Sequence, residues 1–429
     1  MTSDRREFLA TTAAAGWFAA RAAMAGTAQT TTPERWPSAF PALTQRVNGH
    51  PLTFLDSAAT TLRPQSVIDA LVDFYSTDNA NPSRVHTLAS RAGDRLAAAR
   101  QQVARFVNAA DPAEIIFVRG TSEGINLVAG TWGAANLKPG DEIVLGIAEH
   151  ASNLMPWTRA ARQAGATVRI LDVDNDGRLR LDQLKQLLSA RTRLVAFSHV
   201  SNVLGYINPA KEICAIARNA GAAVVIDGAQ GAPHAKIDVR DLGCDFYVFS
   251  GHKMLGPMGT GVVWGRRELL DAMPPYHVGS NMAHAVDFEH AELEHGAQKY
   301  QAGTPDVAGP VGLAAAVRFF EQAGRRLQDH DDVLVRHGLA RLNAIPKLRL
   351  IGPRQPDNRV PVFTFVIEGR AAADVAKAMD AQGIAVRAGD MAALPLLKRF
   401  GVTEAVRASA YVYSTPADLD RLADALLTL

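Results

Sequence analysis

The stretch Asp245-Phe-Tyr-Val-Phe-Ser-Gly-His-Lys253 decides the fold and the chemistry that this chain predicts. It is an apolar run, typical of a buried strand, that ends with a lysine which a buried strand would otherwise avoid. Upstream, Val224-Val-Ile-Asp227-Gly-Ala-Gln230 is a second apolar run, and it ends with a carboxylate. A lysine that forms a Schiff base and an aspartate that pairs with a pyridinium nitrogen are what pyridoxal 5'-phosphate (PLP) requires of a protein. We therefore predict Lys253 as the covalent anchor and Asp227 as the partner of the ring nitrogen.

Short β-rich runs alternate with helical stretches from about residue 56. This alternation predicts an α/β fold with a mostly parallel, seven-stranded sheet covered on both faces. Ligands of such sheets bind beyond the carboxyl ends of the strands. Asp227, His199 and Lys253 fall at or just past predicted strand ends, so we expect them to converge on one site. The expected strands are Glu114–Val118, Glu142–Gly146, Thr167–Asp172, Leu194–Ser198, Ala223–Asp227, Asp245–Ser250 and Gly261–Trp264.

The pattern changes after about Val311, where helical stretches come to dominate. Strand-like runs and a final helix from Pro416 follow, which indicates a second, smaller α+β domain. We therefore expect an N-terminal segment over 29–55, a large PLP-binding domain over 56–310 and a small C-terminal domain over 311–429. The elements expected in the last part are helices Leu313–Ala323 and Asp332–Ala344 and strands Val360–Ile367 and Ile384–Val386.

The first 28 residues have the pattern of a twin-arginine signal peptide. Arg5-Arg6 precedes an apolar, Ala-rich stretch, and Ala23-Met-Ala25 offers an A-x-A cleavage site, with Ala28 as a second option. The apolar run is too short to span a bilayer comfortably. This route exports folded proteins, so a PLP enzyme that uses it acquires its cofactor first. The pattern predicts a periplasmic or secreted protein.

Composition excludes several classes of partner. The net charge is +2, with 48% hydrophobic and 21% charged residues, which gives no indication of nucleic-acid binding. Cys214 and Cys244 form neither a disulfide framework nor a metal-ligand spacing. Asp172–Gly177 imitates the start of a calcium loop, and His290, Glu294 and His295 form a polar cluster. We interpret the first as a turn and the second as a surface stretch, and predict no metal site.

A candidate site for the cofactor phosphate lies at Phe117-Val-Arg-Gly-Thr121-Ser122-Glu-Gly124. This segment follows a predicted strand and opens a predicted helix. Backbone N–H groups at a helix N-terminus, together with the hydroxyls of Thr121 and Ser122, bind anions. The alternative is a plain helix cap made by one of these hydroxyls.

These segments together resemble the cysteine desulfurase and selenocysteine lyase group of the class V aminotransferases, a fold-type-I PLP family. The resemblance covers nearly all of the chain after the signal. The matching runs are Leu55–Ala59, FVRGTSEGINLVAG from Phe117, AEHASN from Ala148, SHVSNVLG from Ser198, IDGAQG from Ile226, DFYVFSGHK from Asp245, QAGTPD from Gln301, GIAVRAG from Gly383 and VRAS from Val406.

The resemblance implies roles for single residues. Lys253 would also move the Cα proton of an amino-acid substrate, beside a ring paired with Asp227 and stacked by His150. It also implies a homodimer with shared active sites, in which Thr304 reaches the phosphate from the partner subunit. The remaining implied cofactor contacts are Thr121, Ser122, Gln230, Ser250 and His252. The implied substrate contacts are Asn202, Arg407, His86 and Arg387, and Arg387 has a structural ion pair as its alternative.

The chain departs from the family where desulfurases carry their catalytic cysteine, in a loop that reads R-x-G-x-x-C-A-x-P. Here the loop is Arg387-Ala-Gly-Asp390-Met-Ala392-Ala-Leu-Pro395, with alanine at the cysteine position. Neither Cys214 nor Cys244 is near it in sequence. Asp390 is either an extra acid or base or a turn-stabilising residue.

Desulfuration requires a thiolate that attacks the substrate sulfur, and alanine cannot supply one. Removal of a leaving group directly from Cβ needs no such acceptor. We therefore expect a PLP-dependent lyase of this family. The alternatives are an amino-acid epimerase resembling isopenicillin N epimerase and a PLP-binding protein with little turnover.

Overall fold

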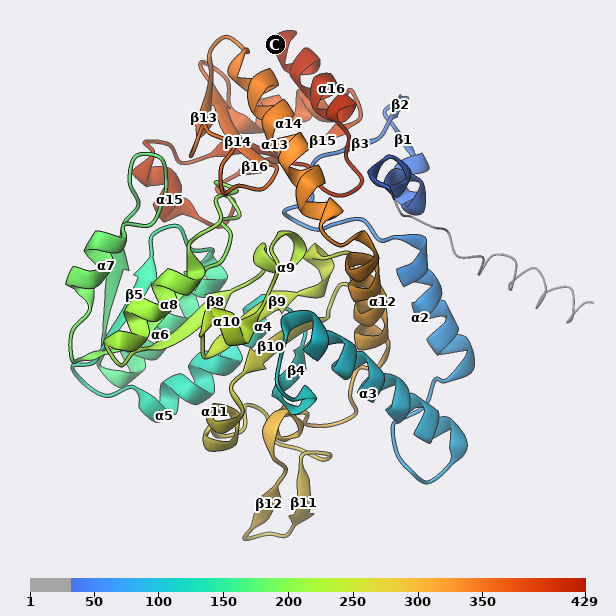
Figure 1. The fold of residues 1–429 in the computed structure, drawn as a ribbon, viewed down its shortest axis with the longest axis vertical. Coiled ribbons are helices and arrows are strands. Elements are labelled where there is room, and N and C mark those ends of the chain that lie inside the picture. Colours follow the sequence, from blue (N-terminus) through green and yellow to red (C-terminus); the bar gives the residue numbers. More distant parts are fainter. Residues whose placement is uncertain (1–31) are drawn as a thin grey trace, which may run out of the picture.

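The computed structural model describes residues 32–429, and its centre is a seven-stranded sheet (Figure 1). The strand order is β4-β10-β9-β8-β7-β5-β6. β10 runs antiparallel to β4 and β9, and the other neighbouring pairs are parallel. The strands are β4 (Ile115–Val118), β5 (Glu142–Gly146), β6 (Thr167–Leu171), β7 (Thr192–Ser198), β8 (Ala223–Asp227), β9 (Phe246–Ser250) and β10 (Gly261–Gly265). The predicted α/β fold with a mostly parallel sheet is confirmed, and each strand lies within two residues of its expected bounds.

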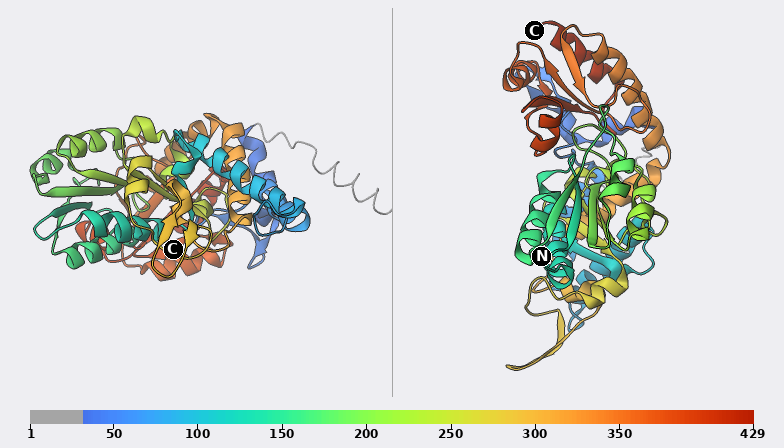
Figure 2. Two further views of the ribbon diagram at one scale, coloured as in Figure 1. Left: turned by 90° about the horizontal axis from the view of Figure 1, so that it is seen from below. Right: turned by 90° about the vertical axis from the view of Figure 1, so that its left-hand side faces the viewer.

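Both faces of this sheet are covered by helices (Figure 2). Val224 and Ile226 of β8 pack in the apolar core on one face, and Val225 packs in the core on the other. Because both faces are buried, the strands have continuous apolar runs instead of alternating ones. The first core takes in α3 (Thr87–Val107), α7 (Leu181–Leu187), α8 (Ala210–Asn219) and α12 (Ala308–Ala323), and the second α4 (Thr121–Val128), α6 (Met155–Ala164) and α11 (Arg267–Ala272).

A four-stranded antiparallel sheet forms the core of the C-terminal part, in the order β13-β14-β17-β16. Phe363 and Phe365 of β14 are fully buried against Leu334 and Leu422 of two covering helices. Figure 1 shows this part in orange and red beside the larger sheet. Its elements are α13 (Arg326–Asn343), β13 (Leu348–Ile351), β14 (Val362–Ile367), α14 (Ala372–Asp380), β15 (Ile384–Ala385), β16 (Arg387–Gly389), α15 (Leu394–Arg399), β17 (Ala405–Ser409) and α16 (Pro416–Leu427).

The segment before residue 56 packs against the C-terminal part. β3 (Thr53–Phe54) pairs in parallel with β15, and the Phe40 ring lies 4.7 Å from the Tyr413 ring, measured between centroids. β1 (Arg46–Val47) and β2 (His50–Pro51) form a small ribbon, and α2 (Gln65–Thr77) packs on α12. The predicted signal peptide and its cleavage sites lie outside the described residues. Within residues 32–429 no helix has the length and apolar character needed to cross a membrane.

The two segments that imitate metal sites are a turn and a hairpin. Asp174 Oδ1 accepts hydrogen bonds from the backbone N–H groups of Asp176 and Arg178, which closes a turn. His290 and Glu294 lie at the hairpin of β11 (Ala283–Val286) and β12 (Ala291–Leu293), which projects from the body in Figure 1. The described part of the chain contains no group of three or more side chains that could hold a metal ion.

Candidate active site

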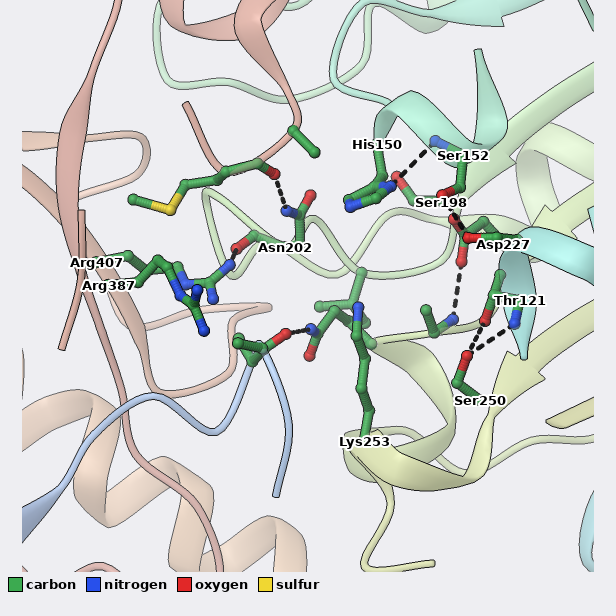
Figure 3. Close-up of a pocket in the computed structure, with 18 of the residues that line it drawn as sticks. Thr121, His150, Ser152, Ser198, Asn202, Asp227, Ser250, Lys253, Arg387 and Arg407 are labelled. Atoms are coloured by element: carbon green, nitrogen blue, oxygen red, sulfur yellow. Dashed lines mark hydrogen bonds between the residues drawn. The ribbon is translucent and has the colours of Figure 1, made fainter. Parts of the chain in front are cut away.

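A pocket of about 540 Å³ lies between the two sheets, beyond the carboxyl ends of β7, β8 and β9 (Figure 3). The larger sheet contributes Asp227 and Lys253, and the smaller one contributes Arg387 and Arg407. Parallel neighbours end at the same edge of a sheet, so residues far apart in sequence meet here. The other predicted site residues that line the pocket are Thr121, Ser122, His150, Asn202, Gln230, Ser250 and His252.

Lys253 and Asp227 form the charged floor of the pocket. Lys253 lies in the single turn Gly251–Lys253 that follows β9, and Asp227 is the last residue of β8. Burial lowers the pKa of Lys253 to about 8, opposed by the Asp227 carboxylate and assisted by the Arg407 cation. Burial raises the pKa of Asp227. More of Lys253 is therefore unprotonated near neutral pH than of an exposed lysine, which makes it a better nucleophile. A second cation beside the buried Asp227 would stabilise its carboxylate form.

The turn after Asp227 is built for close packing. A Cβ on Gly228 would lie 2.1 Å from the Tyr247 ring, so only glycine fits between the end of β8 and β9. Asp227 Oδ1 accepts a hydrogen bond from the Ala229 N–H at 2.9 Å. Gln230, one turn further, is 3% exposed and donates from Nε2 to the Ala58 carbonyl at 2.7 Å. These bonds fix the directions in which Asp227 and Gln230 point.

Four hydroxyl groups line the corner where α4 begins, as Figure 3 shows in part. Ser250 Oγ lies 2.7 Å from both the backbone N and the Oγ1 of Thr121. Ser122 Oγ lies 2.6 Å from Ser152 Oγ. A Cβ on Gly120 would lie 3.2 Å from Ser250 Oγ, so glycine leaves room for this approach. The corner therefore presents hydroxyls and a helix N-terminus to one small volume, which suits a phosphate.

His150 is held as a neutral ring at the side of the pocket. Burial lowers its pKa to about 4, with smaller contributions from the Lys253 and Arg407 cations. Its Nδ1 accepts a hydrogen bond from the Ser152 N–H at 3.1 Å, so the neutral ring carries its proton on Nε2. His252 is likewise neutral, because burial lowers its pKa to about 4. Neutral imidazoles can pack on an aromatic ring without adding charge to the site.

A buried arginine dominates the opposite corner. Arg407 is 3% exposed; it donates from Nη1 to the Asn202 carbonyl at 3.1 Å and lies 3.5 Å from Asp56. Its Nε is buried with no hydrogen-bond partner among the described residues. Arg387 pairs with the same Asp56 at 2.6 Å, so two cations share one carboxylate. A bound carboxylate would supply the missing acceptor and the missing negative charge.

The family model for class V aminotransferases matches residues 53–422. The chain belongs to the class V aminotransferase family. It is 46% identical over 389 residues to a probable cysteine desulfurase of Halalkalibacterium halodurans, which covers 90% of this chain and 95% of that protein. It is equally 46% identical over 389 residues to a cysteine desulfurase of Synechococcus elongatus, covering 90% of this chain but only 62% of that longer protein.

Solved structures agree with this assignment. The crystal structure of a cysteine desulfurase from Escherichia coli superposes with a TM-score of 0.85 at 38% identity, covering 92% of this chain and 97% of the other. The relatives are PLP-dependent class V enzymes, and the family implies PLP as the cofactor. The donor set fits that group: a buried amine, a buried carboxylate that forms no salt bridge among the described residues, a row of hydroxyls and an arginine with an unpaired Nε.

Three of the predicted residues do not enter the pocket of this class V chain. The expectation that His199 joins Asp227 and Lys253 is wrong: His199 does not line the pocket, and its Nδ1 lies 2.9 Å from the Tyr247 hydroxyl. It follows Ser198, which does line the pocket, and successive side chains of a strand point to opposite faces. His86 is instead the exposed N-cap of α3, bonded to the Ala89 N–H at 3.3 Å. Thr304 is exposed and outside this pocket, so its role in a partner subunit stays a prediction.

Two further roles differ from expectation or were missed. Asn202 does not point freely at the substrate position, because its Nδ2 donates to the Met391 carbonyl at 2.9 Å. Glu149, which was not predicted, is fully buried beneath the pocket. It accepts from the N–H and hydroxyl of Ser198 and from Asn153 Nδ2 at 2.7–3.1 Å. The sequence feature that could have indicated Glu149 is its position directly before His150.

Proposed function

We propose that the chain is a PLP-dependent lyase that removes a leaving group directly from Cβ of an amino acid, without a protein-bound persulfide. The observation that carries the proposal is Ala392, a residue with no nucleophile, which lines the pocket at the place where the desulfurase loop bears its cysteine. PLP, when bound, supplies an electron sink for a carbanion at Cα. The other steps of the reaction are carried out by side chains of this chain.

Each step that the proposal needs has a residue in reach of the pocket. Lys253 Nζ takes the Cα proton, which a pKa of about 8 permits near neutral pH. Arg407 holds the substrate carboxylate and thereby orients the Cα–H bond. The electron pair left at Cα would then form a Cα=Cβ double bond while the bond between Cβ and the leaving group breaks. The leaving group would take the electrons of that bond and a proton from solvent. No thiolate is required to accept it.

The native cysteines support the proposal. Cys214 and Cys244 are 1% and 2% exposed and belong to the core of the larger sheet. Burial raises the pKa of Cys214 to about 12 and that of Cys244 well above its ordinary value. Sulfur transfer depends on an accessible thiolate, and neither residue offers one.

The decisive experiment is persulfide trapping after incubation with L-cysteine, read by intact mass. The wild type should carry no persulfide, and Ala392→Cys should gain one per chain. Ala388→Cys is the matched control, because Ala388 lines the same pocket from β16 and should gain none. A stoichiometric persulfide on Cys214 or Cys244 of the wild type would contradict the proposal. Product analysis separates the alternatives: a lyase releases the leaving group into solution, whereas an epimerase converts the L-amino acid to a mixture of L and D forms and releases nothing.

We further propose that the enzyme is a homodimer and that it is exported. Thr304 is exposed and outside its own pocket, as a residue that serves a partner subunit must be. The exposed Val286 and Phe288 give the projecting hairpin an apolar surface suited to a second copy. Arg5-Arg6 before a short apolar run supports export by the twin-arginine route. Sedimentation of the holoenzyme and cell fractionation test the two proposals.

A further inference from the structure

The loop that follows β16 has a backbone conformation that ordinary residues avoid. Met391 and Ala392 are consecutive non-glycine residues with φ of +52° each. An L-residue in this left-handed region costs about 1 kcal/mol or more, and such strain persists only where surrounding contacts impose it. The loop also lines the pocket, through Asp390, Met391 and Ala392. The contacts that impose the strained turn therefore also set one wall of the active site.

Four hydrogen bonds hold the turn, and two of them come from segments that follow strands β5 and β7 of the larger sheet. The Ala151 N–H donates to the Ala392 carbonyl at 2.7 Å, directly after His150. Asn202 Nδ2 donates to the Met391 carbonyl at 2.9 Å. The other two are internal: Asp390 Oδ1 accepts from the Ala392 N–H at 3.0 Å, and the Asp390 carbonyl accepts from the Ala393 N–H at 2.9 Å. The loop thus ties the smaller sheet to the rim of the larger one.

Asp390 is the residue that makes the turn without help from the other domain. A carboxylate that accepts the N–H two residues ahead is a recurrent turn-forming arrangement of aspartate and asparagine. Next in the chain, α15 packs Leu396 and Leu397 into the core of the larger sheet, so the turn is anchored on its far side too. The bond to the Ala392 N–H gives Oδ1 of Asp390 a structural role in the turn.

We propose that Asp390 is a positioning residue: its side chain preforms the left-handed turn that presents Met391 and Ala392 as a fixed wall of the pocket. This goes further than the proposed function, because it gives the wall a defined shape where the leaving group of a substrate would lie. It also assigns Oδ1 of Asp390 to the turn. The part of the claim that concerns the leaving group rests on the proposed lyase function.

The test compares Asp390→Asn with Asp390→Ala in the holoenzyme. Asparagine keeps the acceptor oxygen and removes the charge, whereas alanine removes both. Amide hydrogen exchange at Ala392 and Ala393 should be about fivefold faster in Asp390→Ala, as expected for loss of one hydrogen bond, and unchanged in Asp390→Asn. Asp357→Ala, at another exposed aspartate of the C-terminal part, is the matched control and should leave this exchange unaltered.

A second readout uses L-alanine, an amino acid without a leaving group, titrated against the visible absorption of the bound cofactor. Asp390→Ala should weaken its apparent affinity several-fold, and Asp390→Asn should restore the wild-type value. The positioning role is overturned if Asp390→Ala leaves the exchange unchanged, or if Asp390→Asn is impaired as severely as Asp390→Ala. The exchange measurement needs no turnover, so its failure is distinguishable from a failure of the proposed lyase function.

Discussion

The depressed pKa of Lys253 makes a quantitative prediction about how the apoenzyme takes up PLP. Only the free amine attacks an aldehyde, so the rate of imine formation follows the deprotonated fraction of Lys253. With burial lowering its pKa from 10.5 to about 8, about 20% of Lys253 is unprotonated at pH 7.4, against about 0.08% of an ordinary lysine. The site should therefore load PLP about 250-fold faster at this pH than an exposed lysine of equal intrinsic reactivity.

The assay is stopped-flow absorbance of apoenzyme mixed with PLP between pH 6 and pH 10. The rate should rise tenfold per pH unit below pH 8 and level off above it. Lys253→Ala, which removes the amine, gives the background from other lysines, and a small lysine analogue corrects for the titration of PLP itself. Asp227→Asn should move the plateau to lower pH, because the Asp227 carboxylate is the group that raises the pKa of Lys253. A rate that still climbs tenfold per unit from pH 8 to pH 10 would refute the reasoning.

Three further predictions concern other parts of the chain. Burial raises the pKa of Glu149 from 4.5 to about 8. The contribution of its neutral carboxyl group to the free energy of unfolding is therefore fully present below pH 4.5 and is lost as the pH rises to 8, by up to about 5 kcal/mol. Urea unfolding should show Glu149→Gln gaining on the wild type between pH 5 and pH 8, and a constant difference would contradict this. Arg407→Ala should weaken L-alanine binding at least tenfold more than Arg387→Ala in the spectral titration, because Arg407 is buried with an unpaired Nε while the Arg387 side chain is 48% exposed. Replacing Arg5 and Arg6 by lysine should leave the precursor in the cytoplasm, as cell fractionation would show, and unchanged export would exclude the twin-arginine route.

The fold was predictable because its central strands are buried on both faces. Their apolar runs are continuous, and they end in residues such as Asp227 whose charge is out of place in a core. The strand-end rule predicted that Asp227 and Lys253 meet, and both line one pocket because parallel strands finish at one edge. The same rule failed for His199, because the face to which a side chain points changes with each residue. Strand ends therefore locate a site in sequence but do not decide which side chains enter it.

The sequence could not predict the roles of residues whose interaction partners lie far away along the chain. Asp56 belongs to a recognised motif, yet its role follows from Arg387 and Arg407, more than 300 residues away. Glu149 is polar and fully buried, and only the fold shows that the N–H and hydroxyl of Ser198, at the end of β7, donate to it. Neither pairing leaves a local pattern, because a hydrogen bond between distant segments imposes no spacing on the sequence.

In the lyase that we propose, the arrangement of the two sheets would let one loop alter the chemistry while the rest of the site stays constant. The groups suited to the cofactor and the substrate carboxylate are held by strand ends and by buried pairs, such as Arg407 with Asp56. The segment 390–393 contributes only a wall, and it is held through backbone carbonyls and one aspartate side chain. Backbone contacts tolerate any side chain that accepts the same φ, so we expect Ala392→Cys to leave Lys253 and Asp227 undisturbed. If Ala392→Cys gains a persulfide while PLP uptake is unchanged, the reaction type of this fold is set by that wall alone.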